Sequence, residues 1–237
     1  MEKVLFLGAF FFAYTVQAIT GFAGNIFAMP VGTTLLGLNS TVSILNAMGF
    51  FACGLLALMN IKYVNWRELG KILAVMVVFM MVGIWLDTIM PLHILLKIYG
   101  AVIVVIGAKN LLFKRQKFLP EWALWVILAL AGIIQGMFVS GGALLVIYAV
   151  QKLRDQQEFR ITLSMTWTVL NFIYACIAFQ QGHFTGDVLQ IILMCIPLAV
   201  IATVLGSKLQ KMISRERFLK LVYVMLLLIG IVLVVTS

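Results

Sequence analysis

The stretch Gln135-Gly136-Met137-Phe138-Val139-Ser140-Gly141-Gly142 interrupts an otherwise apolar run of the chain. It places glycines, an amide and a hydroxyl where a plain transmembrane helix would carry leucine. A second stretch of the same character, Thr20-Gly21-Phe22-Ala23-Gly24-Asn25, lies near the start of the sequence. Inside bilayer hydrocarbon a helix break is tolerated only where protein buries it or where it lines a cavity. Two such breaks in corresponding halves of a chain indicate a transporter's binding site.

Composition places the chain in a membrane. Of its 237 residues, 64% are hydrophobic and only 11% are charged, whereas a soluble domain carries roughly 25% charged residues. The fold class predicted is therefore an all-α polytopic membrane protein. The net charge of +9 is explained by basic loops at the cytoplasmic face, so nucleic acid is not an expected partner.

The apolar segments form two sets of five, with a basic linker at 114–121 between the halves 1–113 and 122–237. The first set is Val4–Ile19, Ile26–Leu38, Val42–Ile61, Leu69–Leu86 and Leu92–Phe113. The second set is Trp122–Val139, Ala143–Val150, Ile161–Phe179, Val188–Leu205 and Phe218–Val235. The second segment of each set is shorter than the roughly 20 residues of a spanning helix. Each half therefore begins with a hairpin broken at glycine, and Ala143–Val150 favours a hairpin that turns back.

A sequence repeat supports this division. With a shift of 123 positions, Gly83, Leu86, Leu96, Lys97, Ile106 and Gly107 fall on Gly206, Leu209, Leu219, Lys220, Ile229 and Gly230. Leucine and isoleucine matches are common by chance in membrane sequences. The glycine and lysine matches at one offset are not, so we predict a duplication.

Charge counting predicts the topology. With five segments in each half, lysine and arginine divide 15 to 2 between the two sides, and fusing each short segment with its predecessor gives 9 to 8. The positive-inside rule selects the first arrangement. An odd number of segments per half makes the repeats inverted. Both termini then lie outside the cytoplasm, in a multi-pass protein of the inner or plasma membrane.

The first segment also resembles a signal peptide, because Lys3 precedes the apolar run Val4–Val16. Glu2 cancels the charge of Lys3, and no clear small-x-small cleavage site precedes Gly21. The run has a counterpart in the second half as well. We therefore expect it to be retained as a membrane segment.

The two breaks have the chemistry of an anion site. Helices that begin inside the membrane leave N–H groups unpaired, and these groups carry partial positive charge. Glycine lets a ligand approach the backbone, while hydroxyls and amides supply further hydrogen bonds. The predicted substrate-binding residues are Thr20, Gly21, Gly24, Asn25, Gln135, Gly136, Ser140, Gly141 and Gly142. Inverted repeats would bring both breaks together near the midplane.

Each of these residues also has a purely structural interpretation. Glycine is frequent in membrane helices because it lets neighbouring helices pack closely, and this is the favoured interpretation for any single glycine. Two clusters that each combine glycine with an amide and a hydroxyl favour a site. Four further polar residues would either line the same cavity or bond to neighbouring helices, namely Asn46, Thr166, Trp167 and Asn171.

Charged side chains are missing where the breaks lie. No Asp, Glu, Lys or Arg falls between Lys3 and Lys62, or between Glu121 and Lys152. We expect an interior without buried charge, which binds a small anion through backbone dipoles and neutral donors. Proton relays use intramembrane carboxylates or histidines, and this pattern disfavours one.

Other site chemistries have weak support. Cys53, Cys176 and Cys195 lie inside apolar segments without ligand spacing, so they are expected in the core and not at a metal. An intramembrane serine protease built on Ser140 would need a base within the membrane, and His93 and His183 lie at segment ends. We expect no catalytic residue, no metal and no cofactor.

The sequence resembles the TauE/SafE family of sulfite and organosulfonate transporters, the toluene sulfonate uptake permease group. The resemblance rests on Gly21-Phe22-Ala23-Gly24-Asn25 leading to Met29-Pro30, on Gly136–Gly142, on the basic linker and on the last helix with Gly230. It covers nearly the whole chain and implies export of a small sulfur-containing anion across a lipid bilayer. A facilitator for another small anion and a non-transporting assembly subunit are the alternatives.

Overall fold

The computed structural model describes residues 2–87, 119–138, 141–153 and 155–236. Its helices are α1 (Glu2–Thr20), α2 (Gly24–Leu36), α3 (Leu38–Met59), α4 (Trp66–Asp87), α6 (Glu121–Phe138), α7 (Gly142–Lys152), α8 (Gln156–Gln180), α9 (Gly186–Lys211) and α10 (Arg215–Thr236), with a short 3-10 helix η1 (Ile61–Tyr63). Every predicted segment within these ranges is a helix, and the ranges contain no strand. Segment Leu92–Phe113 and residues 114–118 of the linker lie outside the described residues.

Helix lengths agree with a membrane protein. Among the described residues, five helices are long and apolar enough to cross a bilayer: Lys3–Thr20, Asn39–Met59, Trp66–Leu86, Gln156–Gln180 and Gly186–Lys211. Large apolar side chains such as Phe12, Val78 and Leu193 are exposed on these helices, as expected for a surface that faces lipid. With 13 and 11 residues, α2 and α7 are too short to span. The all-α membrane class is confirmed, and the inverted arrangement stays a prediction.

The described helices belong to two compact units. Unit 1 comprises Met1–Leu73 and Gln157–Met212, and unit 2 comprises Ala74–Gln156 and Ile213–Ser237. Each unit therefore contains segments from both halves of the sequence. The predicted repeat boundaries at 113 and 122 are not tested by this division.

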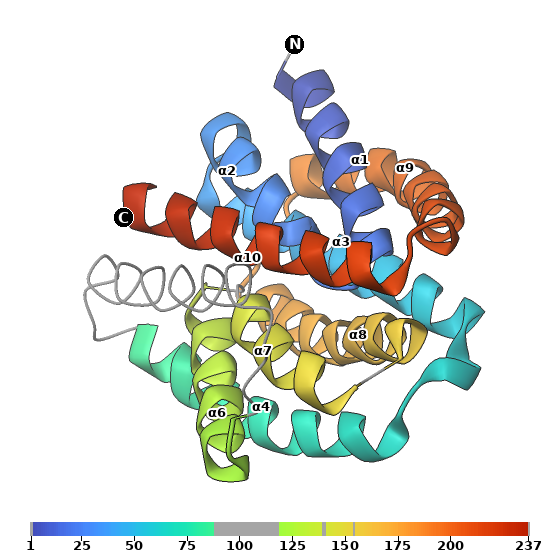
Figure 1. The fold of residues 1–237 in the computed structure, drawn as a ribbon. Helices are drawn as coiled ribbons and strands as arrows, with labels where there is room; N and C mark the ends of the chain where they lie inside the picture. The colour runs from blue at the N-terminus through green and yellow to red at the C-terminus, as the bar shows by residue number, and fades with distance from the viewer. Residues whose placement is uncertain (1, 88–118, 139–140, 154, 237) are drawn as a thin grey trace. The chain divides into compact units, whose positions relative to one another are not determined.

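Unit 1 is built around α1, which packs on α2 and on α9, while α3 packs on the same two helices. Figure 1 shows α1 in dark blue between α2 and α9. Apolar side chains at helical spacing fill the interior, for example Phe6, Phe10 and Ala13 of α1. The rings of Phe10 and Tyr14 stack with centroids 4.1 Å apart. Burial of these aromatic side chains holds α1, which leads into the first break, against its neighbours in unit 1.

Unit 2 contains a close contact between α4 and α6. A Cβ atom placed on Gly136 would collide with the carbonyl oxygen of Met80, and one on Gly83 would collide with that of Ile133. Glycine at these positions lets the two backbones touch, as small residues do in membrane helix pairs. Helix α6 also packs on α7. This contact fixes the position of α6, which leads into the second break.

Candidate functional site

The first break lies between α1 and α2. Helix α1 ends at Thr20, Gly21 adopts a φ of 87° that favours glycine, and α2 begins at Gly24. The side-chain Oε1 of Gln17 accepts a hydrogen bond from the Gly24 N–H at 2.5 Å. The Thr20 hydroxyl donates to the Val16 carbonyl oxygen at 2.9 Å. Polar groups of α1 thus satisfy part of the backbone that the break exposes.

Both glycines of this break make close contacts within unit 1. A Cβ on Gly21 would lie 2.7 Å from the carbonyl oxygen of Arg160, and a Cβ on Gly24 would lie 2.7 Å from the Cβ of Gln17. Side chains at these positions would overlap neighbouring atoms. Packing alone is therefore sufficient to require glycine at Gly21 and Gly24, whatever they contribute to binding.

Two predicted asparagines come together beside the break. The Tyr14 hydroxyl lies 3.0 Å from both the Oδ1 of Asn25 and the Leu45 carbonyl oxygen. A Cβ on Gly49 of α3 would lie 2.5 Å from the Nδ2 of Asn171 and 3.6 Å from the Nδ2 of Asn25. The missing side chain at Gly49 therefore lets both amides approach the α3 backbone at one place. We call Tyr14, Asn25 and Asn171 the amide cluster.

Three of the four predicted lining residues hold polar atoms without partners. The Oδ1 atoms of Asn46 and Asn171 and the Nε1 of Trp167 are buried and have no hydrogen-bond partner among the described residues. The Thr166 hydroxyl instead donates to the Thr162 carbonyl oxygen at 2.9 Å. Because buried polar atoms usually have partners, the three unpartnered residues are the better ligand candidates.

The second break lies between α6 and α7 in unit 2. The Oε1 of Gln135 accepts a hydrogen bond from the Gly141 N–H at 3.0 Å, and Gln135 is 1% exposed. Helix α7 begins at Gly142. A Cβ on Gly141 would collide with the Ala131 carbonyl oxygen. Ser140 lies outside the described residues.

The two breaks share one local feature. In each, a glutamine in the last turns of the preceding helix accepts the N–H of a glycine at the start of the next helix, Gln17 for Gly24 and Gln135 for Gly141. The separations of seven and six residues are nearly equal. The amide side chain supplies the acceptor that the interrupted helix cannot provide.

A second contact also recurs. A Cβ on Gly206 of α9 would lie 2.7 Å from the Thr15 carbonyl oxygen of α1, and a Cβ on Gly83 of α4 would collide with the Ile133 carbonyl oxygen of α6. In sequence order, the fourth segment of one half thus meets the first segment of the other half in both units. Gly83 and Gly206 are related by the 123-residue shift of the sequence repeat.

The predicted site residues divide between the units. Residues of the first break and the four lining residues belong to unit 1, and the described residues of the second break belong to unit 2. Within unit 1, the structure brings Asn25 and Asn171 together. The meeting of the two breaks stays a prediction, as does the role of every residue named in it.

Sequence reasoning missed three residues of unit 1 that hold this region in place, Tyr14, Gln17 and Gly49. Gln17 had a detectable signal, since glutamines precede both glycine breaks at similar distances within apolar runs. Tyr14 and Gly49 had none, because tyrosine and glycine are ordinary residues of membrane helices.

The structure corrects two expectations. The interior was expected to lack buried charge, but Arg160 of α8 is only 1% exposed. The apolar pattern begins the third segment of the second half at Ile161 and so predicts a loop at Arg160, whereas α8 begins at Gln156. Cys53 and Cys195 are buried as expected, but Cys176 is exposed.

Metal-ligating side chains are dispersed over the described ranges. No group of three or more metal-ligating side chains occurs in that part of the chain. His183 lies half-buried in the turn between α8 and α9, and His93 lies outside the described residues.

Apolar helices of spanning length around a buried polar interior define a multi-pass membrane protein. The family described as sulfite exporter TauE/SafE matches residues 5–233, and the chain belongs to this family of transporters. A relative from Comamonas testosteroni, named "Probable inner membrane transporter protein TsaS", is 28% identical over 180 residues, which are 73% of this chain and 74% of the relative. No solved structure matches the chain.

Proposed function

We propose that this protein exports a small sulfur-containing oxyanion, sulfite or an organosulfonate, across the inner membrane and catalyses no reaction. Membership of the sulfite exporter family supports the substrate class and the direction. The relative's printed name supports the inner membrane as its location. The observation that carries the proposed binding site is the amide cluster, in which Asn25 and Asn171 approach one point of α3 beside the first break.

The chemistry of the amide cluster suits an oxyanion. Sulfite and sulfonate oxygens accept hydrogen bonds, and the side-chain NH₂ groups of asparagine can donate them. The Tyr14 hydroxyl lies within hydrogen-bonding distance of the Asn25 Oδ1 and so helps to orient that amide. A half-turn of the Asn171 amide exchanges its unpartnered oxygen for an NH₂ donor. First-turn N–H groups of α2 add partial positive charge at the same break. In a water-poor interior these donors act more strongly than they would in water.

We also propose that the two halves form inverted repeats whose breaks enter from opposite faces and meet, with both termini outside the cytoplasm. The recurring glutamine caps support this arrangement. The recurring glycine contacts between fourth and first segments support it as well. Within a duplicated chain such paired contacts are expected, because equivalent residues meet equivalent neighbours.

The test is sulfite uptake into proteoliposomes by wild type and by Asn171→Leu, which keeps the number and branching of the side-chain heavy atoms and removes the amide. Hydrogen bonds to charged groups contribute about 1.5–3 kcal/mol, so we expect the half-saturating sulfite concentration to rise at least ~10-fold. Asn39→Leu is the matched control, because Asn39 is exposed. Equal half-saturation in Asn171→Leu and wild type would contradict the site.

Direction is measured separately. Export predicts sulfite accumulation in inside-out vesicles and none in right-side-out vesicles prepared from the same cells. Accumulation confined to right-side-out vesicles would reverse the proposed direction and leave the amide cluster in place as the site.

A further inference from the structure

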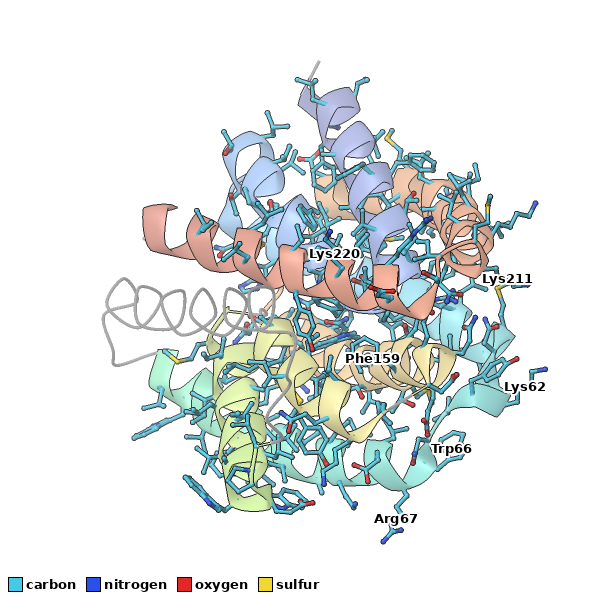
Figure 2. All side chains as sticks on the ribbon, in the orientation of Figure 1. Lys62, Trp66, Arg67, Phe159, Lys211 and Lys220 are labelled. Atoms are coloured by element: carbon cyan, nitrogen blue, oxygen red, sulfur yellow. The ribbon has the colours of Figure 1, made fainter. Side chains whose placement is uncertain are left out.

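Arg160 lies in the second turn of α8 and is 1% exposed. Other basic side chains of unit 1, Lys62, Arg67 and Lys211, are exposed. Figure 2 shows these three side chains extending outward from the ribbon, as basic residues do at a membrane surface. The positive-inside rule explains the exposed residues, but it does not explain why Arg160 is buried.

Neutral groups hold the Arg160 guanidinium. Its Nη1 donates to the Oε1 atoms of Gln157 and Gln210 at 3.1 and 3.0 Å, and its Nη2 donates to the Ser207 hydroxyl oxygen at 2.7 Å. The Nε–H is buried and has no partner among the described residues. A guanidinium has more N–H donors than these three bonds use, so the edge formed by Nε and Nη2 retains donor capacity.

Carboxylates near this end of unit 1 bond to other groups. Glu158 accepts a hydrogen bond from the Asn65 side chain at 2.6 Å, and Glu68 pairs with Lys71 at 2.6 Å. Within the described ranges, no ion pair includes Arg160. A buried charge without a counter-charge is costly. An arriving anion would remove that cost and satisfy the Nε–H.

Arg160 is directly connected to the first break. A Cβ on Gly21 would lie 2.7 Å from the Arg160 carbonyl oxygen and 3.0 Å from its Cα, so the break packs on the α8 backbone at this residue. The first half has no equivalent cation, since no lysine or arginine lies between Lys3 and Lys62. The two halves of the sequence therefore differ chemically at this position, because only the second half supplies a buried cation.

We propose that Arg160 and Ser207 form an oxyanion-binding site at the cytoplasmic end of unit 1, which we call the arginine site. The substrate is held there before it reaches the amide cluster. The Nε–H and a second Nη2 hydrogen bind two oxygens of one sulfite or sulfonate group, as guanidinium groups bind planar pairs of acceptors. The Ser207 hydroxyl accepts from Nη2 and keeps its own proton to donate to the third oxygen. This site rests on the proposed function for its substrate.

The experiment measures sulfite-induced thermal stabilisation of the purified full-length protein in detergent, from which the dissociation constant is obtained. Every protein compared, wild type included, also carries Asn171→Leu, so that binding at the amide cluster does not mask binding at Arg160. Arg160→Gln removes the charge, and we expect sulfite to bind at least ~30-fold more weakly because truncating a buried charged partner is costly. Arg160→Lys keeps the charge but lacks the paired N–H donors of a guanidinium, and this variant should bind sulfite with intermediate affinity. Ser207→Ala should bind about 10-fold more weakly. Arg67→Gln, with its exposed side chain, should bind as wild type does.

The outcomes separate this site from the proposed function. Wild-type affinity in Arg160→Gln overturns the arginine site and leaves the proposed function standing. Equal weakening in Arg67→Gln also overturns it, because the effect would then be one of general surface charge. If Arg160→Gln does not fold, Arg160→Lys and Ser207→Ala decide, and wild-type affinity in both overturns the site. No stabilisation of wild type by sulfite or any organosulfonate overturns the proposed function, and the arginine site with it.

Discussion

Replacing Gly21 by alanine tests whether the first break packs on α8. Gly21 has a φ of 87°, and an added Cβ would lie 2.7 Å from the Arg160 carbonyl oxygen. Gly37 has a similar φ of 80°, but a Cβ there would meet nothing within 4 Å. Gly8, inside α1, has neither a positive φ nor a close neighbour. These three positions separate backbone strain from overlap with α8.

The expected magnitudes follow from these differences. An alanine held in the backbone conformations of these glycines costs about 1–3 kcal/mol, which applies to Gly37→Ala, at φ 80° and ψ 161°, and to Gly21→Ala. Overlap in a packed interior adds about 1–3 kcal/mol, which applies to Gly21→Ala alone. We therefore expect Gly21→Ala to lower the free energy of unfolding by about 2–6 kcal/mol. Gly8→Ala should be neutral or stabilising by up to about 1 kcal/mol, because alanine favours helix.

The assay is reversible chemical unfolding of the purified variants in mixed micelles, followed by circular dichroism. The decisive quantity is the difference between Gly21→Ala and Gly37→Ala. If the two variants lose the same stability, the packing of the first break on Arg160 is refuted. The connection between the break and the arginine site would be refuted with it.

Three further predictions concern the caps, the helix contact and the topology. Gln17→Leu leaves the Gly24 N–H without its acceptor and should lower the free energy of unfolding by about 1–3 kcal/mol in the same assay; an unchanged value would contradict the cap. Gly136→Ala should cost about 1–3 kcal/mol because the methyl group meets the α4 backbone, whereas Gly70→Ala, whose Cβ meets open space, should not be destabilised; similar losses in both would argue against the contact. A cysteine at Lys62 should react with a membrane-impermeant maleimide in inside-out vesicles, and reaction only in right-side-out vesicles would invert the topology.

The helices were predictable because hydropathy reports burial in lipid, and the structure places a helix at each predicted segment within the described ranges. Helix ends were less predictable. Val188–Leu205 was expected where α9 spans Gly186–Lys211. A helix can continue for one or more polar turns beyond the hydrocarbon of the bilayer. Hydropathy does not detect these polar turns, so the predicted segment is shorter than the helix.

The extension of helices past their apolar segments also explains why the burial of Arg160 was not predicted. Arg160 belongs to the polar first turns of α8, and its burial depends on contacts with Ser207 and Gln210, which are far away in sequence. Local sequence cannot report such a contact. Gly136 is predicted to let a ligand approach the backbone, and the structure adds a close contact between this glycine and the Met80 carbonyl oxygen of α4. Asn25 and Asn171 stand out in the sequence because amides are costly in lipid, and the structure brings them together beside the first break; their role in binding stays a prediction.

Radiolabelled sulfite counterflow in proteoliposomes of the wild-type protein tests the central claim most directly. With unlabelled sulfite inside, a carrier exchanges label inward against a net gradient, whereas a passive leak does not. We predict transient accumulation of label that is abolished by an excess of external unlabelled organosulfonate. Label accumulation no greater than in protein-free liposomes, with protein that is folded by circular dichroism, would contradict the assignment of a sulfur-oxyanion carrier.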